Sequence, residues 1–451
     1  VIDATGAPPK RNMTVVITGN RITALGKTSE TEIPEGAQVV EAKGKFLIPG
    51  LWDMHVHIFN QVSRRPPNTW YFPLFIANGV TGVRDLWTKP EDMGQVREWR
   101  RLHSEGMLTA PRIAAVGTIV DGPTGAEARN MALLQLGPTV NFVSTPDEAR
   151  RFVRELKAAG IDFVKPYSNL PRETYLALAD ECKKQGIPFA GHVPTEVDAA
   201  EASSVGQQSL EHLLQILESS SSRSQELFQV PGRKWSSKHE ETMLDTFDEE
   251  RFEELVALLA RNQTWQIPTL AISRVHLFRW NLRMIRNDSW LRYIPAAEVA
   301  SWKEPLPTED REPTNAEKAI GRRLWKKRLE AVRRMNEAGV PFMAGSDVGN
   351  PYIFPGFTLH DELALLVDAG LTPMKALQAA TRNPALFLGL SDSLGTVEEG
   401  KIADLVLLGA NPLKDIRNTQ QIRAVVVNGR YLDRAEVDKL LAQAEVAARK
   451  N

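Results

Sequence analysis

The chain has 451 residues, of which 42% are hydrophobic and 25% are charged, an ordinary composition for a globular protein. A net charge of −1 gives no support for a nucleic acid or an acidic membrane as partner. The single cysteine, Cys182, excludes an internal disulfide, and no apolar run reaches the roughly 18 residues that span a bilayer. The sequence begins at Val1 within a predicted strand and leaves the compartment undetermined.

Both ends of the chain carry short segments with the composition of β-strands. These segments lie at 13–17, 21–25, 38–40, 403–408 and 422–430. The first two flank Thr18-Gly19-Asn20, which is typical of a hairpin turn. Because such small strands need a partner sheet, we expect residues 1–46 and 391–451 to form one small β-sandwich domain, with a helix at its C-terminal end.

The central part of the chain, residues 47–390, alternates strand and helix signals. The helical patterns include 146–159 and 171–185. Alternation of this kind over such a length predicts an α/β fold, specifically a (β/α)8 TIM barrel. An open doubly wound sheet is the alternative, but no Gly-rich dinucleotide turn supports it. The strand candidates are 47–57, 79–85, 112–117, 161–167, 187–192, 207–212, 266–272 and 340–347.

Residues 219–320 are expected to form an enlarged connection of the barrel. Long connections at the C-terminal face of a barrel shape a site or close over it, and a packed pair of surface helices is the alternative. The following helix, near 319–337, is rich in Arg and Lys. These basic residues fall opposite an apolar stripe, so we interpret them as a solvated face and not as a nucleic-acid patch.

Two histidines close the predicted strand at 47–57. Side chains two positions apart on a strand point to the same side, so His55 and His57 can reach one point, as metal ligands must. Four other residues able to bind a metal end other predicted strands, namely Lys165, His192, His212 and Asp347. The C-terminal ends of barrel strands converge on one mouth, so we expect all six side chains to meet there.

Together these residues resemble the amidohydrolase superfamily, in its imidazolonepropionase-like and prolidase-like branch. The resemblance covers nearly the whole chain, and its short blocks are specific as a set. They are the block from Pro49-Gly50 to His57, Gly79-Val80-Thr81-Gly82-Val83-Arg84-Asp85, Lys165-Pro166-Tyr167-Ser168, Gly191-His192-Val193-Pro194, Ser209-Leu210-Glu211-His212, Gly345-Ser346-Asp347 and Gly400-Lys401-Ile402-Ala403-Asp404-Leu405-Val406.

The resemblance implies a site with two divalent metal ions, most often zinc. His55, His57 and Asp347 would hold the more buried ion, and His192 and His212 the more exposed one. Lys165 would bridge both ions as a carbamate formed with carbon dioxide. A protonated lysine is repelled by two dications, which favours the neutral amine that this reaction needs. The alternative for Lys165 is an ordinary salt bridge at the barrel mouth.

The same resemblance implies metal-assisted hydrolysis by a bridging hydroxide. Asp347 would accept the proton of the water and pass it to the departing nitrogen. Tyr167 and His276 are candidate donors to the oxyanion. The alternatives are that Tyr167 only packs beside Lys165 and that His276 is an ordinary loop residue. His360 is expected to lie at a helix start and not to be a ligand.

The expected substrate is a small-molecule amide, such as a dipeptide, an N-acyl amino acid or a related compound. The alternatives are a cyclic amide, a lactone, an aryl amide or a urea at the same site, or a barrel that binds without turnover. Arg223, Arg233 and Arg274 are available for a substrate carboxylate. We expect no nucleic-acid or membrane partner, and self-association into a homo-oligomer stays open, as for many barrels.

Two catalytic motifs are excluded. Residues 395–401 match the first positions of a P-loop, but Ile402 stands where Ser or Thr is needed. Gly345-Ser346-Asp347 lacks the closing glycine of a nucleophile elbow. The sequence therefore argues against both a nucleotide phosphate site and a serine hydrolase.

Overall fold

The computed structural model describes residues 1–59, 67–123, 141–228, 237–281, 289–302 and 312–450. Its main part is an α/β fold with a parallel sheet, as the sequence predicts. Strands β4 (Leu51–Val56), β5 (Val80–Asp85), β6 (Arg112–Asp121) and β8 (Phe163–Pro166) pair in parallel in that order. The short β7 (Asn141–Phe142) pairs with the end of β6, and β9 (Ser209–Glu211) pairs in parallel with β10 (Trp265–Ile267).

Single parallel bridges connect these sheets. Val164 bridges to Phe189, Gly191 to Leu210, Gln266 to Phe342, and Val56 to Val348. The segments expected as strands at 187–192 and 340–347 therefore contribute isolated bridges in place of long strands. A series of parallel pairs leads from β4 through β5, β6, β8, β9 and β10 to residue 342, and residue 348 pairs back with β4.

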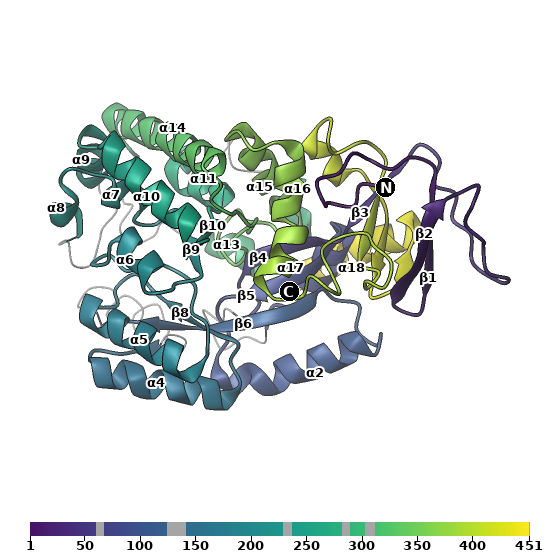
Figure 1. Cartoon of the computed structure of the whole chain (residues 1–451), viewed down its shortest axis with the longest axis horizontal. Helices are drawn as coiled ribbons and strands as arrows, with labels where there is room; N and C mark the ends of the chain where they lie inside the picture. The colour runs from purple at the N-terminus through teal and green to yellow at the C-terminus, as the bar shows by residue number, and fades with distance from the viewer. Residues whose placement is uncertain (60–66, 124–140, 229–236, 282–288, 303–311, 451) are drawn as a thin grey trace.

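Helices cover the strands on the outside (Figure 1). The Thr145 hydroxyl caps α4 (Pro146–Ala159) by accepting from the Glu148 N–H, and Gly160 ends this helix in the left-handed conformation. The expected helix at 146–159 is confirmed. The helices between β4 and the C-terminal sheet are α1 (Tyr71–Ala77), η1 (Pro90–Asp92), α2 (Met93–Ser104), α4 (Pro146–Ala159), α5 (Arg172–Gln185), α6 (Ala199–Ser204), α7 (Ile216–Ser219), α8 (Ser224–Phe228), α9 (Ser237–Asp245), α10 (Glu249–Arg261), α11 (Leu270–Phe278), η2 (Leu291–Tyr293), α13 (Ala296–Ser301), α14 (Asn315–Glu337), α15 (Phe357–Asp368), α16 (Pro373–Ala379) and α17 (Arg382–Phe387).

Segments from the two ends of the chain lie side by side in one sheet (Figure 1). Strand β3 (Phe46–Pro49) pairs antiparallel with β11 (Leu405–Leu408), and β12 (Ile422–Val427) and β13 (Arg430–Leu432) extend this sheet. Strands β1 (Met13–Thr18) and β2 (Arg21–Lys27) form a separate antiparallel pair. Helix η3 (Ile416–Gln420) and the C-terminal helix α18 (Arg434–Lys450) complete this part.

Two expected strands are wrong. Residues 38–40 form no strand, and Val39 is 67% exposed, because no described strand pairs with this segment. The strand expected at 266–272 ends at Ile267, and α11 begins three residues later. An apolar run of this length does not distinguish a strand from a buried helix.

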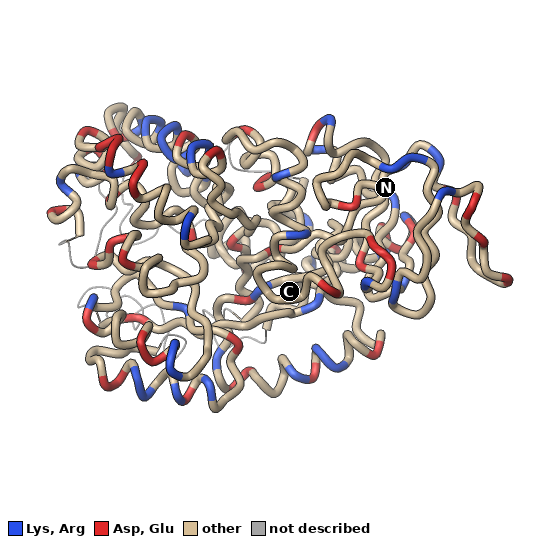
Figure 2. The backbone as a smooth tube through the Cα atoms, viewed as in Figure 1, with Lys and Arg blue, Asp and Glu red and all other residues tan. Residues whose placement is uncertain are grey.

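The enlarged connection expected at 219–320 is divided by β10, since α8, α9 and α10 precede that strand and α11, η2 and α13 follow it. Farther along the chain, α14 carries many Lys and Arg residues, whose positions are blue along the backbone in Figure 2. Arg334 pairs there with Glu249, Glu253 and Glu330. No helix among the described residues is long and apolar enough to cross a membrane.

Candidate metal centre

His55 lies in β4 and His57 directly follows it, and the alternation of side chains along an extended chain predicts that the two imidazoles point to the same side. His55 is fully buried and His57 is 4% exposed. Both Nε2 atoms approach the same oxygen of Asp347, Oδ1, at 3.3 Å from His55 and 2.8 Å from His57. One potential ligand atom from each of these three residues lies within 4.8 Å of the others.

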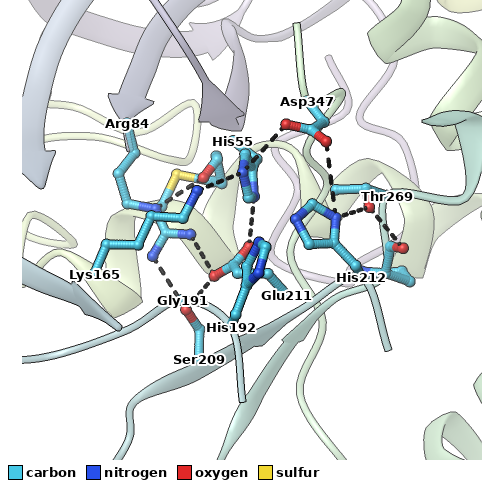
Figure 3. A network of polar contacts seen from close by, with 12 residues as sticks. His55, Arg84, Lys165, Gly191, His192, Ser209, Glu211, His212, Thr269 and Asp347 are labelled. Carbon is cyan, nitrogen blue, oxygen red and sulfur yellow. Dashed lines mark hydrogen bonds and ion pairs between the residues drawn. The ribbon is translucent and has the colours of Figure 1, made fainter. Parts of the chain in front are cut away.

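The other three predicted ligands lie beside this group (Figure 3). Lys165 Nζ is 3.5 Å from His55 Nε2, and His212 Nδ1 is 3.9 Å from Asp347 Oδ2. The ring of His212 lies 4.7 Å from that of His55 and 4.8 Å from that of His192. The structure therefore brings together six side chains that are up to 292 positions apart in the sequence, His55 being the first and Asp347 the last.

The backbone is strained at two of these residues. His212 and Asp347 have φ values of +64° and +63°, which cost free energy in residues other than glycine. Hydrogen bonds hold both in place, because the His212 N–H donates to Ile267 O and the Asp347 N–H donates to His55 O, each at 2.9 Å. Strain that is held in this way is typical of functional sites.

Glu211 fixes the orientation of His55. Its Oε2 lies 2.8 Å from His55 Nδ1, while its Oε1 accepts from Arg84 and Ser209. The Arg84 guanidinium is fully buried and lies 5.3 Å from the ring centres of both Phe163 and Phe387. A carboxylate on one ring nitrogen leaves the other free to bind a metal.

Hydroxyl groups play the same part for the other pair of histidines. Ser168 Oγ lies 2.8 Å from His192 Nδ1, and Thr269 Oγ1 lies 2.6 Å from His212 Nδ1. Each ring is thereby held by Nδ1, which leaves Nε2 for an ion. Sequence reasoning did not assign a role to Glu211, Ser168 or Thr269. Glu211 and Ser168 stand in the same short motif blocks as predicted ligands, but no pattern there says which ring each would contact.

The donor set fits a cation. With Nδ1 of His55 donating to Glu211, the lone pair of Nε2 faces the Asp347 carboxylate at 3.3 Å, an arrangement that is repulsive without a positive charge between them. The Lys165 amine approaches the same nitrogen only to 3.5 Å. In addition, the buried Nδ1 of His57 has no hydrogen-bond partner within the described part of the chain.

The protonation states also suit metal binding, which needs neutral imidazole and ionised carboxylate. Burial and the neighbouring Lys165 hold the pKa of His55 well below its ordinary value. Burial lowers the pKa of His212 to about 3, although Asp347 opposes this shift. Burial by itself would raise the pKa of Asp347, but His212 and the hydrogen bond with His57 outweigh it and lower the pKa.

Lys165 is a buried amine. Burial lowers its pKa from 10.5 to about 8, with Asp347 and Glu211 opposing the shift. The position is tightly enclosed, since a Cβ at Gly191 would lie 2.7 Å from Lys165 Cγ and 2.9 Å from Pro166 O. Gly191 also has a φ of +155°, which L side chains rarely adopt. Only glycine therefore fits beside this lysine.

A family comparison decides what kind of protein carries this centre. The model of the amidohydrolase family matches residues 46–432. The chain belongs to the amidohydrolase family. This match confirms the resemblance that the sequence motifs indicate. In addition, an imidazolonepropionase of Symbiobacterium thermophilum is 40% identical over 78 residues, which are 17% of this chain and 18% of that protein.

Longer matches of this amidohydrolase are more distant. Ochratoxinase of Aspergillus niger is 22% identical over 92% of the chain and 81% of its own length. Among solved structures, bottromycin amidohydrolase aligns with a TM-score of 0.74 at 23% identity, covering 99% of this chain and 88% of that chain. A Xaa-Pro dipeptidase with bound methionine aligns with a TM-score of 0.66 at 20% identity, covering 96% and 97%. These structures support a shared fold.

Tyr167 and His276, the predicted oxyanion donors of this amidohydrolase, both lie beside the centre. The Tyr167 ring is stacked on His192 at 4.1 Å and lies 5.5 Å from Lys165 Nζ, so it also packs beside that lysine. His276 lies on α11 and not in a loop. His276 is exposed, and the desolvation caused by the surrounding protein lowers its pKa, with Asp347 opposing the shift.

Two of the three candidate cations for a substrate carboxylate pair with acidic side chains. Arg223 pairs with Glu226 on the surface, and Arg274 lies 3.3 Å from Asp361. Arg233 lies outside the described residues. His360 is inside α15 and contacts Thr419 Oγ1 and Asn78 O, which agrees with a structural role.

Proposed function

We propose that this amidohydrolase cleaves a C–N amide bond of a small molecule at a centre that holds two divalent metal ions, most simply zinc. The substrate class is a dipeptide, an N-acyl amino acid or a related amide. The observation that carries the proposal is the convergence of His55, His57 and Asp347 on one point, with Lys165, His192 and His212 beside it.

In this proposal His55, His57 and Asp347 would hold one ion, and His192 and His212 would hold the other. The neutral Lys165 amine would bond through Nζ to the carbon of carbon dioxide and release one proton, and the resulting carbamate anion would supply further oxygen ligands. A pKa of about 8 supports this step, because a substantial fraction of the amine is neutral near that pH. Bound ions would supply a hydroxide near neutral pH and polarise the scissile carbonyl.

The protein side chains move the protons. Asp347 Oδ1 is contacted by His55 and His57, whereas Oδ2 lies 3.9 Å from His212 Nδ1. We assign Oδ2 as the atom that accepts the proton of the attacking water and delivers it to the leaving nitrogen. In the same proposal Tyr167 and His276 would donate to the oxygen of the tetrahedral intermediate.

We also propose that the strands close into a complete (β/α)8 barrel. The support is the series of parallel pairs that starts at β4 and returns to it at Val348. In the same proposal residues 1–46 and 391–451 form a β-sandwich domain. It is supported by the β3–β11 pairing and by the bridge from Arg21 to Ile402, which joins the β1–β2 pair to the C-terminal segment.

The test combines metal analysis with a hydrolysis screen. The protein is prepared with zinc and bicarbonate, and a library of dipeptides, N-acyl amino acids, cyclic amides, lactones and aryl amides is assayed. Asp347→Asn should lower kcat by about 10²–10⁴-fold, whereas Asp361→Asn, at a partly buried residue of α15 that pairs with Arg274, should leave it unchanged. Bound zinc without hydrolysis of any library member would instead favour a barrel that binds without turnover.

A further inference from the structure

Helix α11 begins where β10 ends, directly beside the metal centre, and its first residues lack the usual cap. Thr269 occupies the N-cap position at a φ of +44° and makes no side-chain bond to the helix backbone. Its hydroxyl lies 2.6 Å from His212 Nδ1 and donates to Pro268 O at 2.8 Å (Figure 3). A threonine in this position ordinarily caps its own helix.

The hydroxyl of Thr269 carries a single proton. When that proton is donated to Pro268 O, both contacts of the hydroxyl are satisfied only if His212 Nδ1 is the donor of the second one. This arrangement places the lone pair of His212 on Nε2, the tautomer that can bind a metal through that nitrogen. Capping α11 with the same hydroxyl would remove this constraint on His212.

Glu362 provides the missing cap from another helix. Its side chain projects from α15 and is fully buried. Oε1 accepts from the Leu270 N–H at 2.9 Å, and Oε2 accepts from the Ala271 N–H at 2.8 Å. These are the first two N–H groups of α11, which have no partner within the helix.

The buried position of Glu362 disfavours a carboxylate anion. Burial raises its pKa from 4.5 to about 8, against the two backbone N–H groups, while the charge of Asp53 raises it further and Arg274 lowers it. A serine or threonine hydroxyl at the N-cap position 269 could accept from one of these N–H groups without burying an acid. The cost suggests that the hydroxyl of residue 269 is needed elsewhere.

We propose that Glu362 is a positioning residue for the metal centre: it caps α11 in place of Thr269, which leaves the Thr269 hydroxyl to hold His212 in the tautomer that binds metal through Nε2. The inference rests on the proposed function in taking His212 as a metal ligand. The described geometry connects the two residues in one line, from Glu362 through the start of α11 and Thr269 to His212.

Three single variants test this line of contacts, together with a double variant that combines Glu362→Gln and Thr269→Val. Glu362→Gln keeps the shape but offers only one acceptor oxygen, so one N–H of α11 loses its partner. Thr269→Val removes the hydroxyl and keeps the Glu362 contacts. Asp361→Asn is the matched control, because Asp361 precedes Glu362 on α15 and contacts Arg274.

The first readout is the affinity for zinc, measured by competition with a chromophoric chelator. We expect Glu362→Gln and Thr269→Val each to weaken one of two zinc sites by about 10-fold, with no change in Asp361→Asn. The double variant should lose no more zinc affinity than the single variant with the larger loss, because both substitutions interrupt one path. A Glu362→Gln protein that melts earlier but binds zinc as the wild type does, or losses that add in the double variant, would overturn the proposal.

The second readout needs neither metal nor turnover. In the metal-free protein with ¹⁵N-labelled histidine, assigned by His212→Gln, the shifts of His212 should report the Nδ1–H form. Glu362→Gln should shift the ring toward a mixture of tautomers, and an unchanged spectrum would contradict the proposal. If the wild type binds no zinc, the proposed function fails, while this measurement still decides the role of Glu362.

Discussion

His55 Nδ1 and Glu211 Oε2 lie 2.8 Å apart, and both residues are fully buried. The pair aims His55 Nε2 at Asp347, so the metal site depends on a carboxylate that is itself not a ligand. The opposite oxygen of Glu211 accepts from Arg84 and Ser209. A glutamine at 211 would turn an NH₂ group toward either Arg84 or His55, and both of these are donors.

Glu211→Gln is therefore expected to weaken zinc binding by about 10–100-fold, as measured by chelator competition. Glu181→Gln serves as the control, because Glu181 lies on α5 and pairs with Arg154 of α4, away from the centre. Equal zinc affinity in the wild type and in Glu211→Gln would show that His55 keeps its orientation without this carboxylate.

Gly191→Ala is expected to remove zinc binding and activity together. The new Cβ would lie 2.7 Å from Lys165 Cγ, so the lysine must move, and the strained backbone adds a cost of about 1–3 kcal/mol. Gly186→Ala separates the two effects. Gly186 has a φ of +60° with nothing within 4 Å of its Cβ position, so its substitution should cost about 1 kcal/mol and leave the zinc content intact.

Metal content by atomic spectroscopy and unfolding in urea give the comparison. A Gly191→Ala protein with full zinc content would mean that the enclosure of Lys165 does not matter for the centre.

His360 gives the protein a pH-dependent stability. Burial lowers its pKa from 6.5 to about 4, so the unfolded chain binds a proton between these values and the folded protein does not. Stability therefore falls as the pH drops from about 6.5 toward 4, by up to about 3 kcal/mol from this group. Above pH 6.5 the contribution is constant.

His360→Gln can donate to Asn78 O and cannot titrate. The difference in free energy of unfolding between the wild type and this variant, measured in urea at pH 7.5 and pH 5, isolates the contribution of His360 from those of the other histidines. The wild type should lose more stability than the variant over this interval; parallel losses would assign the pH dependence to other groups.

Removing metal should destabilise the parallel-sheet part of the protein, because the proposed ligands come from β4, from β8 and from residues near β9 and β10. A zinc concentration about 100 times the dissociation constant stabilises the folded protein by about 2.7 kcal/mol. We expect the melting temperature to rise with added zinc in the wild type and not in His55→Asn. An equal rise in both proteins would point to zinc binding at another place.

The sequence was sufficient for the elements whose signals are local. The helix at 146–159 carries its own cap, apolar stripe and closing glycine, and it forms within those bounds. The six predicted ligands also meet, since each follows an apolar run that enters the parallel sheet. In contrast, residues 38–40 have the composition of a strand but lack a partner among the described strands. The composition of one segment does not determine which other segment it pairs with.

The contacts behind the ligands could not be predicted for the same reason. Glu211 adjoins His212 in the sequence yet serves His55, which is 156 positions away. Glu362 serves the start of α11 from another helix, 92 positions from Leu270. A charge in an apolar segment signals that some partner must exist, but the partner depends on how the strands and helices are arranged.

The strand that leaves the terminal sheet continues into the metal centre. Gly50 alone separates β3 from β4, its N–H donates to Asp404 O at 2.7 Å, and a Cβ there would lie 2.0 Å from Thr81 Oγ1. For protein engineering this means that the barrel cannot be excised by cutting at residue 47 and residue 390. Such a fragment would lose the anchorage of the chain five residues before His55, so fusions and shortened versions should retain both terminal segments.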